Sequence, residues 1–440
     1  MDDRTQRYVN NLSKMIQKET ISHVDDNDKT KFREFHQLLK ELFPNLFKVV
    51  EFEEFDGSIL LIWRGKNKDA MPILLMNHHD VVETQGEWKY PAFSGQVAEG
   101  KLWGRGTLDT KGGLWGMLQA ADELAAEGFV PNVDVYFESA CTEETSGDGA
   151  EAISNELYSR GIKFSMVLDE GGMIMYEPIG GAKGTFAMVG MGEKGCAELQ
   201  FIARSNGGHA STPEKDTPLV RLGKFMAEVD SSNLFDIEIS PVICEMFKRL
   251  APSVSGPIGK IFARPEAFTP ILKRVMPKTS ATANALLQST IVFTMAQGSE
   301  SRNVIPAEAS VVGNMRVSHH QGYASSLDAV MKIAEKYGLE TVELTPAIDS
   351  PLADYNGEGF KLIESAVIHA FEDVVTVPYI MTGASDSRFM AKVSDNCFHF
   401  VPFKIDEQQL ESIHGINENV DVSTLIPAVD FYRYVISEAR

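Results

Sequence analysis

The sequence has few cysteines. Only four occur among its 440 residues, at positions 141, 196, 244 and 397, and no two of them form a Cys-x-x-Cys pair. Four cysteines without such spacing do not indicate a disulfide framework, so we expect a reducing compartment and a cytoplasmic protein. The first residues, Met1-Asp2-Asp3-Arg4, are polar and acidic, and no secretory signal is visible there.

Long apolar runs and excess positive charge are lacking too. No uncharged apolar run reaches the roughly 18 residues of a membrane span, and we expect no membrane partner. The chain has 41 Lys and Arg against 62 Asp and Glu, a net charge of −21. Such a surface repels phosphate backbones, so we also expect no nucleic-acid partner. With 43% hydrophobic and 23% charged residues, the composition excludes a disordered or collagen-like chain.

Apolar runs of strand length alternate with helical patterns in the first part of the chain. This alternation predicts an α/β fold, with a mixed sheet between helices. The predicted helices span residues 4–20, 32–42, 112–128 and 148–160. The predicted strands span residues 59–63, 72–76, 133–137 and 164–168.

The pattern changes near residue 196 and returns after residue 350. Residues 197–203 alternate as a half-exposed antiparallel strand does, which indicates a separate α+β unit. The further elements predicted in this unit are a helix at 216–230, a Pro-rich and less periodic stretch at 241–280, and strands at 289–295 and 309–316. After the unit we predict helices at 357–371, 385–393 and 424–438, and strands at 376–381 and 397–403. The predicted organisation is one domain, residues 1–195 and 317–440, interrupted by an inserted domain, residues 196–316.

Five polar clusters follow predicted strands or fall in loops. They span residues 77–80, 103–113, 142–147, 169–172 and 414–418. Taken singly, each fits a solvated or capping loop, and His79 is expected to be structural. Together they bring carboxylates and two histidines to one sheet edge, where the carboxylates repel one another unless cations neutralise them. Imidazole and carboxylate ligands suit zinc, cobalt or manganese, and several carboxylates with two histidines suit a two-metal site.

Two other motifs were considered and set aside. Residues 190–195 spell G-x-G-x-x-G, but a dinucleotide site needs a helix next, and a strand is predicted there instead. No G-x-S-x-G nucleophile elbow occurs, which disfavours a serine hydrolase.

The five clusters resemble the M20 family of metallopeptidases and aminoacylases over nearly the whole chain. The most specific matches are H-x-D-V-V at residues 78–82, G-R-G-x-x-D-x-K-G at residues 104–112, and Glu143-Glu144. The chain resembles in particular the branch of carboxypeptidase S, Gly-Xaa carboxypeptidase and N-fatty-acyl-amino-acid hydrolase. The segments that carry this second resemblance are 169–172, 282–285, 303–306, 382–388 and 413–418.

The resemblance implies a zinc-peptidase-like catalytic domain interrupted by a lid domain. It also implies two bound Zn²⁺ ions, with Co²⁺ or Mn²⁺ as alternatives. The implied metal ligands are His78, Asp109, Glu144, Asp169 and His414. Asp109 would bridge both ions. At the fourth cluster Asp169 is favoured over the adjacent Glu170, and the choice stays open.

Further residues take implied roles in catalysis. Glu143 would be the general base and later the proton donor to the leaving amine, and Asp80 would orient His78. Many family members have a second Asp after the bridging one, often across a cis peptide bond; here that position is Thr110.

The lid and the C-terminal part contribute candidate substrate contacts. The loop at 207–211 matches the family's G-x-H-x-S, so His209 would stabilise the oxyanion; in some relatives this residue comes from a partner subunit. Asn303 and Arg316 resemble lid residues near the substrate. Arg388 would grip a substrate carboxylate bidentately, or else pair with Asp386.

The functional hypothesis is a dinuclear metal-dependent amidohydrolase or carboxypeptidase. It would cleave the amide bond next to a free C-terminal carboxylate in short peptides or N-acyl amino acids. The enzymatic alternatives are an aminoacylase, a succinyl-diaminopimelate desuccinylase or a dipeptidase. The alternative from another class is a catalytically silent relative that binds metal or peptide. We expect a monomer or a homodimer formed through the lid.

Overall fold

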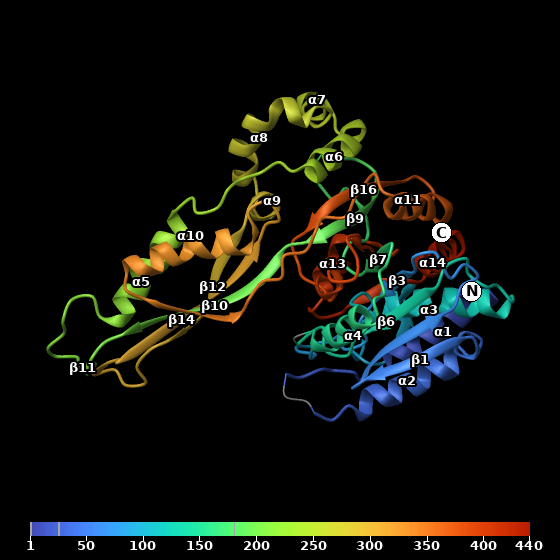
Figure 1. The fold of residues 1–440 in the computed structure, drawn as a ribbon, viewed down its shortest axis with the longest axis horizontal. Coiled ribbons are helices and arrows are strands. Elements are labelled where there is room, and N and C mark those ends of the chain that lie inside the picture. Colours follow the sequence, from blue (N-terminus) through green and yellow to red (C-terminus); the bar gives the residue numbers. More distant parts are fainter. Residues whose placement is uncertain (1, 25–26, 146, 180) are drawn as a thin grey trace.

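A computed structural model describes residues 2–24, 27–145, 147–179 and 181–440 of the chain. Ser146, in the third polar cluster, therefore lies outside the described residues. The chain forms a main unit, from which an elongated lid projects (Figure 1). The G-x-G-x-x-G stretch lies where strand β9 (Thr185–Glu193) of the main unit continues into strand β10 (Gly195–Arg204) of the lid, so a strand and not a helix follows it.

The main unit is built on a ten-stranded mixed sheet, as predicted. Its strand order is β1-β2-β6-β3-β7-β17-β9-β8-β18, and β16 pairs with β9. The strands are β1 (Val50–Phe55), β2 (Ser58–Trp63), β3 (Ile73–Met76), β6 (Val135–Ser139), β7 (Met166–Asp169), β8 (Ile174–Tyr176), β9 (Thr185–Glu193), β16 (Val374–Met381), β17 (Cys397–His399) and β18 (Lys404–Ile405). The central strands β6, β3 and β7 run parallel. All three are fully buried and mostly apolar, as is typical of strands covered on both faces, and the polar residues of β6 and β7 lie at their carboxyl ends.

Helices cover both faces of this sheet. Along β2 and β3, alternate residues such as Leu61 and Leu75 belong to one buried cluster, and Leu60 and Leu74 belong to a second cluster on the opposite face. The helices of the main unit are α1 (Asp3–Ile16), α2 (Thr30–Leu42), α3 (Lys111–Ala126), α4 (Asp148–Ser159), α11 (Glu358–Ala370), α12 (Ser387–Met390), α13 (Glu407–Ser412) and α14 (Leu425–Glu438), with 3-10 turns at Leu46–Lys48 and Val422–Thr424. A three-stranded sheet of β4 (Gln96–Ala98), β5 (Lys101–Trp103) and β19 (Asn419–Asp421) completes the unit.

The lid has its own sheet and its own core. Its strand order is β12 (Thr290–Gln297), β14 (Glu308–Val317), β10 (Gly195–Arg204) and β15 (Glu340–Thr345). Helices α5 (Pro218–Ser231) and α10 (Gly322–Lys336) lie beside it, and Phe201, Phe225 and Phe293 form an aromatic cluster in the lid core. The predicted end of the insertion at residue 316 is too early, because β15 pairs with β10. A short ribbon of β11 (Gly208–His209) and β13 (Val304–Ile305) forms the far end of the lid (Figure 1).

The Pro-rich stretch forms short helices. These are α6 (Pro241–Leu250), α7 (Gly256–Phe262), α8 (Thr269–Val275) and α9 (Ala281–Leu287), with 3-10 turns at Ala251–Ser253, Pro265–Phe268 and Met276–Lys278. Proline occupies the first turn of several of them, where its missing N–H costs no helical hydrogen bond. Val242, Ile243 and Phe247 of α6 belong to the core cluster of the main unit, so α6 packs there and not on the lid. Within the described part of the chain, no helix is both long and apolar enough to cross a membrane.

Candidate metal centre

Three carboxylates surround the imidazole of His78, which lies just after β3. Its Nε2 atom is 3.0 Å from Asp109 Oδ1, 3.4 Å from Glu170 Oε1 and 3.9 Å from Glu143 Oε2. His78, Asp109 and Glu170 each direct one ligand atom into the same small space. This is the arrangement expected of one cation site.

A second group forms around His414, in the loop after α13. Its Nε2 atom is 2.9 Å from Asp109 Oδ2 and 3.0 Å from Glu144 Oε2. Asp109 thus presents one carboxylate oxygen to each imidazole and is shared by both groups. The Asp109–Thr110 peptide bond is cis, as the family resemblance implies.

The order of the strands explains why these side chains meet. β6, β3 and β7 are neighbours in the sheet, and the polar loops that start at residues 77, 140 and 170 follow their carboxyl ends. Parallel neighbours end at the same edge of a sheet, which is where α/β proteins place their sites.

Asp80 links two of these loops. Its buried carboxylate has Oδ1 3.3 Å from His78 Nδ1, and it accepts hydrogen bonds from the backbone N–H groups of Glu143 and Glu144. Ser22 Oγ donates a further hydrogen bond of 2.6 Å. Asp80 is therefore in position to orient both the imidazole and the Glu143-Glu144 pair.

The fourth cluster differs from the prediction. Asp169 does not face the imidazoles: its Oδ2 accepts hydrogen bonds from Ser385 Oγ at 2.8 Å and from the Ser387 N–H at 2.9 Å. The neighbouring Glu170 takes the place beside His78 instead. Asp169 is the last residue of β7, and successive side chains of a strand point to opposite sides, so only one of the two acids can face the site.

The residues of this centre fit divalent cations. Burial raises the pKa of Glu143 to about 8, and it also raises the pKa values of Glu144 and Glu170. The negative charge of neighbouring carboxylates raises these pKa values further. Hydrogen bonds with Asp109 and Glu144 raise the pKa of His414 to about 10. Glu144 Oε1 is buried and has no hydrogen-bond partner among the described residues. Crowded carboxylates with such an unused oxygen form a site that cations stabilise.

Glu418 holds the loop that carries Asp109, a role that the sequence did not reveal. Its fully buried carboxylate receives hydrogen bonds from Arg105 Nη1 at 2.7 Å and from the backbone N–H groups of Gly106, Leu108 and Asp109. Arg105 Nη2 also donates to the Gly415 carbonyl, next to His414. Glu418 and Arg105 both lie in polar clusters noted in the sequence, but they are 313 positions apart.

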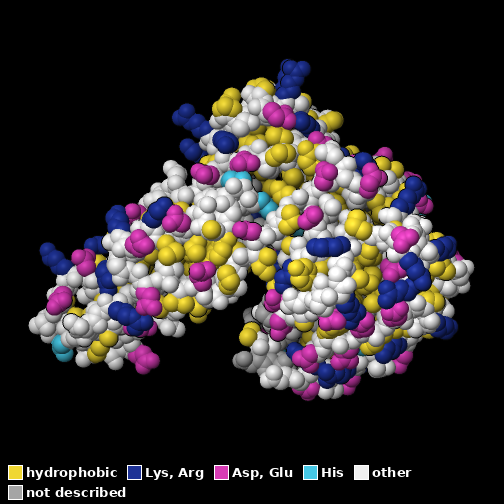
Figure 2. Space-filling model, viewed as in Figure 1, with side chains coloured by type: hydrophobic (Ala, Val, Ile, Leu, Met, Phe, Trp, Pro, Cys, Tyr) yellow, Lys and Arg dark blue, Asp and Glu magenta, His cyan; other side chains and the backbone are white. Residues whose placement is uncertain are grey.

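The candidate lid residues do not reach the metal centre within one chain. His209 is exposed in β11, and the Ala210 N–H donates to the Asn303 carbonyl, so His209 and Asn303 share the far end of the lid. Figure 2 shows a hollow between this end and the main unit. Arg316 lies in β14, where its Nε donates to Asn314 Oδ1.

Arg388 lies in the main unit, beside Asp386. Its Nη1 donates to the Ser385 carbonyl, and its guanidinium stacks over the Phe389 ring. A Cβ atom on Gly147 would come 2.6 Å from both Arg388 Nη2 and Asp386 Oδ1, which places the two charged groups together at that glycine. Burial raises the pKa of Asp386 well above its usual range, and the nearby arginine opposes this shift.

Comparison with known proteins identifies the class of this fold and site. Residues 74–438 match Peptidase family M20/M25/M40, and the chain belongs to that family. It is therefore a metal-dependent enzyme of the metallopeptidase and amidohydrolase class.

Relatives of known name cover nearly the whole chain. A probable carboxypeptidase S-like protein of Dictyostelium discoideum is 29% identical over 443 residues, which cover 98% of this chain and 84% of the relative. A human N-fatty-acyl-amino acid synthase/hydrolase is 29% identical, over 97% of this chain and 87% of its own. The crystal structure of an M20 family metallo-carboxypeptidase from Sulfolobus solfataricus has the same fold, with a TM-score of 0.71, 17% identity and 99% of both chains covered.

We predict that Glu418→Gln destabilises the protein. The amide leaves the buried Arg105 guanidinium without a counter-charge, which costs about 3 to 5 kcal/mol when one partner of a buried pair is removed. Urea denaturation gives the free energy of unfolding, and Glu358→Gln, at an exposed carboxylate, is the matched control. If Glu418→Gln lowered the free energy of unfolding no more than the control does, Glu418 would not hold the loop that carries Asp109.

Proposed function

We propose that the protein hydrolyses the amide bond next to a free carboxylate in short peptides or N-acyl amino acids, using two divalent cations. Zn²⁺ is the proposed metal, with Co²⁺ or Mn²⁺ as alternatives. The observation that carries this proposal is the position of Asp109, which directs its two carboxylate oxygens to two different imidazoles. One acid shared by two ligand groups is typical of two-metal hydrolases.

Each proposed ion has its own residues and shares Asp109. His78 and Glu170 would hold one ion, and Glu144 and His414 would hold the other. When bound, such ions polarise a carbonyl group and lower the pKa of bound water towards about 7.

Glu143 is the proposed proton carrier. Its carboxylate lies in the same space, 3.9 Å from His78 Nε2, but it does not belong to either group that contains Asp109. Burial raises the pKa of Glu143, which favours its acceptance of a proton. Glu143 would take a proton from the attacking water and then deliver it to the leaving amine.

The named relatives support the substrate class. Carboxypeptidase S-like proteins and N-fatty-acyl-amino acid hydrolases act, by their names, at an amide bond beside an amino-acid carboxylate. In this chain Arg388 is the proposed contact for that carboxylate, because a guanidinium binds a carboxylate with two parallel hydrogen bonds. The alternative is that Arg388 forms an ion pair with Asp386. Aminoacylase, succinyl-diaminopimelate desuccinylase and dipeptidase activities remain the rivals within the family.

A second copy of the chain would complete the site. His209 and Asn303 lie at the end of the lid, away from the metal centre of their own chain, and we propose that they serve the centre of a partner. Strand β12 is an edge of the lid sheet and exposes Val292 and Met295, which suits pairing between two lids.

The four cysteines are free, which supports the proposal of a reducing, cytoplasmic setting.

We predict that Glu143→Gln abolishes turnover without emptying the metal site. Loss of a positioned acid–base group lowers kcat by about 10²- to 10⁴-fold. Activity is measured on dipeptides, N-acyl amino acids and their carboxyl-amidated analogues, and metal content is measured by mass spectrometry. Glu151→Gln, at a half-exposed carboxylate on helix α4, is the control. Near-wild-type rates would exclude Glu143 as the base, and equal hydrolysis of amidated substrates would exclude recognition of the carboxylate.

We predict that Glu170→Gln lowers the metal content from two ions to about one per chain, because Glu170 faces His78. Asp169→Asn should keep both ions, since Asp169 is bonded to Ser385 and Ser387. Chelation should stop turnover of the wild type, and added Zn²⁺ should restore it. The reverse result, loss of an ion in Asp169→Asn only, would return the ligand role to Asp169.

We predict that two inactive variants restore activity when they are mixed. If His209 acts on the partner's metal centre, a dimer of His209→Ala and Glu143→Gln chains contains one complete site. Random exchange of subunits then gives about a quarter of wild-type activity. Each variant alone, taken through the same unfolding and refolding, is the control. No recovery in a mixture that is shown to contain mixed dimers would place His209 in its own chain's site.

A further inference from the structure

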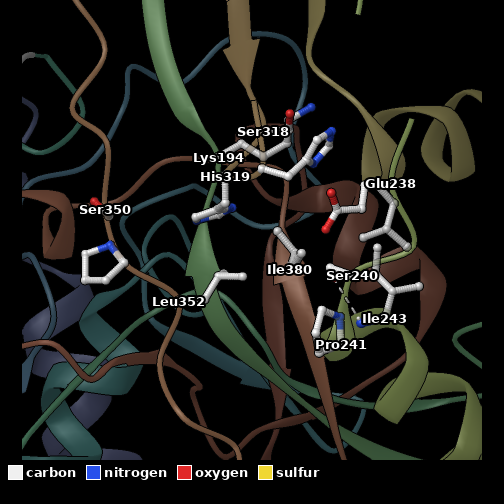
Figure 3. A pocket seen from close by; sticks show the side chains of 13 residues that line it. Lys194, Glu238, Ser240, Pro241, Ile243, Ser318, His319, Ser350, Leu352 and Ile380 are labelled. Carbon is white, nitrogen blue, oxygen red and sulfur yellow. Dashed lines mark hydrogen bonds between the residues drawn. The ribbon is translucent and has the colours of Figure 1, made fainter. Parts of the chain in front are cut away.

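A cavity of about 320 Å³ lies where the lid joins the main unit (Figure 3). Its walls come from the chain segments that pass between the two parts: the β9–β10 junction at Lys194, the segment before α6, the end of β14 at Ser318 and the return segment 350–352. A molecule in this cavity would therefore touch every one of these segments. The cavity is distinct from the candidate metal centre, none of whose proposed ligands lines it.

One wall of the cavity carries a buried positive charge. Lys194 is 1% exposed, and its Nζ donates hydrogen bonds to the carbonyl oxygens of Ala285 and Gln288, at 2.8 and 2.6 Å. It forms no ion pair with a carboxylate that the structure describes. Burial, together with the nearby Arg316, lowers the pKa of Lys194 to about 7. In a chain with 62 acids against 41 bases, an ammonium group buried without a counter-charge is unusual and costly.

Two further polar atoms of the cavity wall have no partner. Among the described residues, neither His319 Nε2 nor Ser350 Oγ forms a hydrogen bond, although both atoms are buried. Burial, together with the charge of Lys194, lowers the pKa of His319 to about 4, so its ring is neutral at pH 7. Buried polar groups are normally hydrogen-bonded, and these two therefore lack a partner that a ligand could supply.

The opposite wall is apolar. Pro241, Ile243, Leu352 and Ile380 line it, and Figure 3 shows Pro241 and Ile243 across the cavity from Lys194 and His319. Glu238 also lines the cavity, but the described hydrogen bonds of Lys194 Nζ go to the carbonyls of Ala285 and Gln288 and not to this carboxylate. A cationic and hydrogen-bonding wall that faces an apolar one suits a molecule with one negative charge and a hydrocarbon part.

We propose that this junction cavity binds a monocarboxylate with an apolar chain, its carboxylate on Lys194 and His319 and its chain against Ile243 and Ile380. The carboxylate supplies the counter-charge that Lys194 lacks, and charge-assisted hydrogen bonds of this kind are among the strong ones. The site is independent of the proposed hydrolysis, because its occupation requires no turnover.

Calorimetry with octanoate on the full-length, metal-loaded protein tests the site. Octanoate should bind, and octan-1-ol and acetate should each bind at least about tenfold more weakly, since one lacks the charge and the other the chain. Lys194→Met should weaken octanoate binding by about tenfold or more. Lys332→Met, at an exposed lysine of α10, is the matched control and should bind as the wild type does.

A second variant covers the case in which Lys194→Met does not fold. His319→Phe keeps an aromatic side chain but removes both ring nitrogens, among them Nε2, which has no hydrogen-bond partner among the described residues, and it should also weaken octanoate binding. Unchanged octanoate affinity in folded Lys194→Met or in folded His319→Phe would overturn the proposal. Octan-1-ol binding as tightly as octanoate would overturn it too. Binding that is lost in Glu170→Gln but kept in His319→Phe would place octanoate at the metal centre and would also overturn it.

Discussion

The repulsion among buried carboxylates is the constraint around which this protein is arranged. Asp109, Glu143, Glu144 and Glu170 converge on one small space, and only two imidazoles offset their charge. Burial strengthens every one of these interactions, since a low dielectric weakens screening. The fold keeps the acids together by anchoring their backbones. The Asp80 carboxylate accepts hydrogen bonds from the backbone N–H groups of Glu143 and Glu144. Cations bound at this place would relieve the repulsion among the acids.

The anchoring extends from the centre to distant parts of the chain. Glu418 receives three backbone N–H groups of the Asp109 loop, and its charge is balanced by Arg105, which in turn contacts the loop of His414. One buried ion pair thus fixes Asp109 and the loop of His414 in relation to each other. The chain belongs to a metal-dependent family, and this pair holds two of the candidate metal ligands in place through protein contacts alone.

Sequence reasoning succeeded where the signal was local. The buried parallel strand β3 is a continuous apolar run, β6 begins with three apolar residues, and the loops that follow both strands carry polar residues. It failed at the fourth cluster, where it favoured Asp169 over Glu170 as the metal ligand. Which of the two side chains points to the site depends on the residue at which β7 ends, and a shift of one position would reverse the two directions. It also missed the Glu418–Arg105 pair, whose members are distant in sequence, and the extent of the lid, because β15 is a largely exposed strand without a clear apolar pattern.

The lid and the main unit have separate buried cores. The aromatic cluster of the lid shares no member with the two clusters of the main unit, so each part is stabilised by itself. Contacts between two such parts resemble a transient interface, and relative motion is the expected behaviour. The chain segments that join them surround a cavity, although Ile243 and Ile380 in its wall belong to the core of the main unit. We therefore expect the position of the lid to depend on what occupies this junction, while the candidate metal centre is held by its own hydrogen bonds.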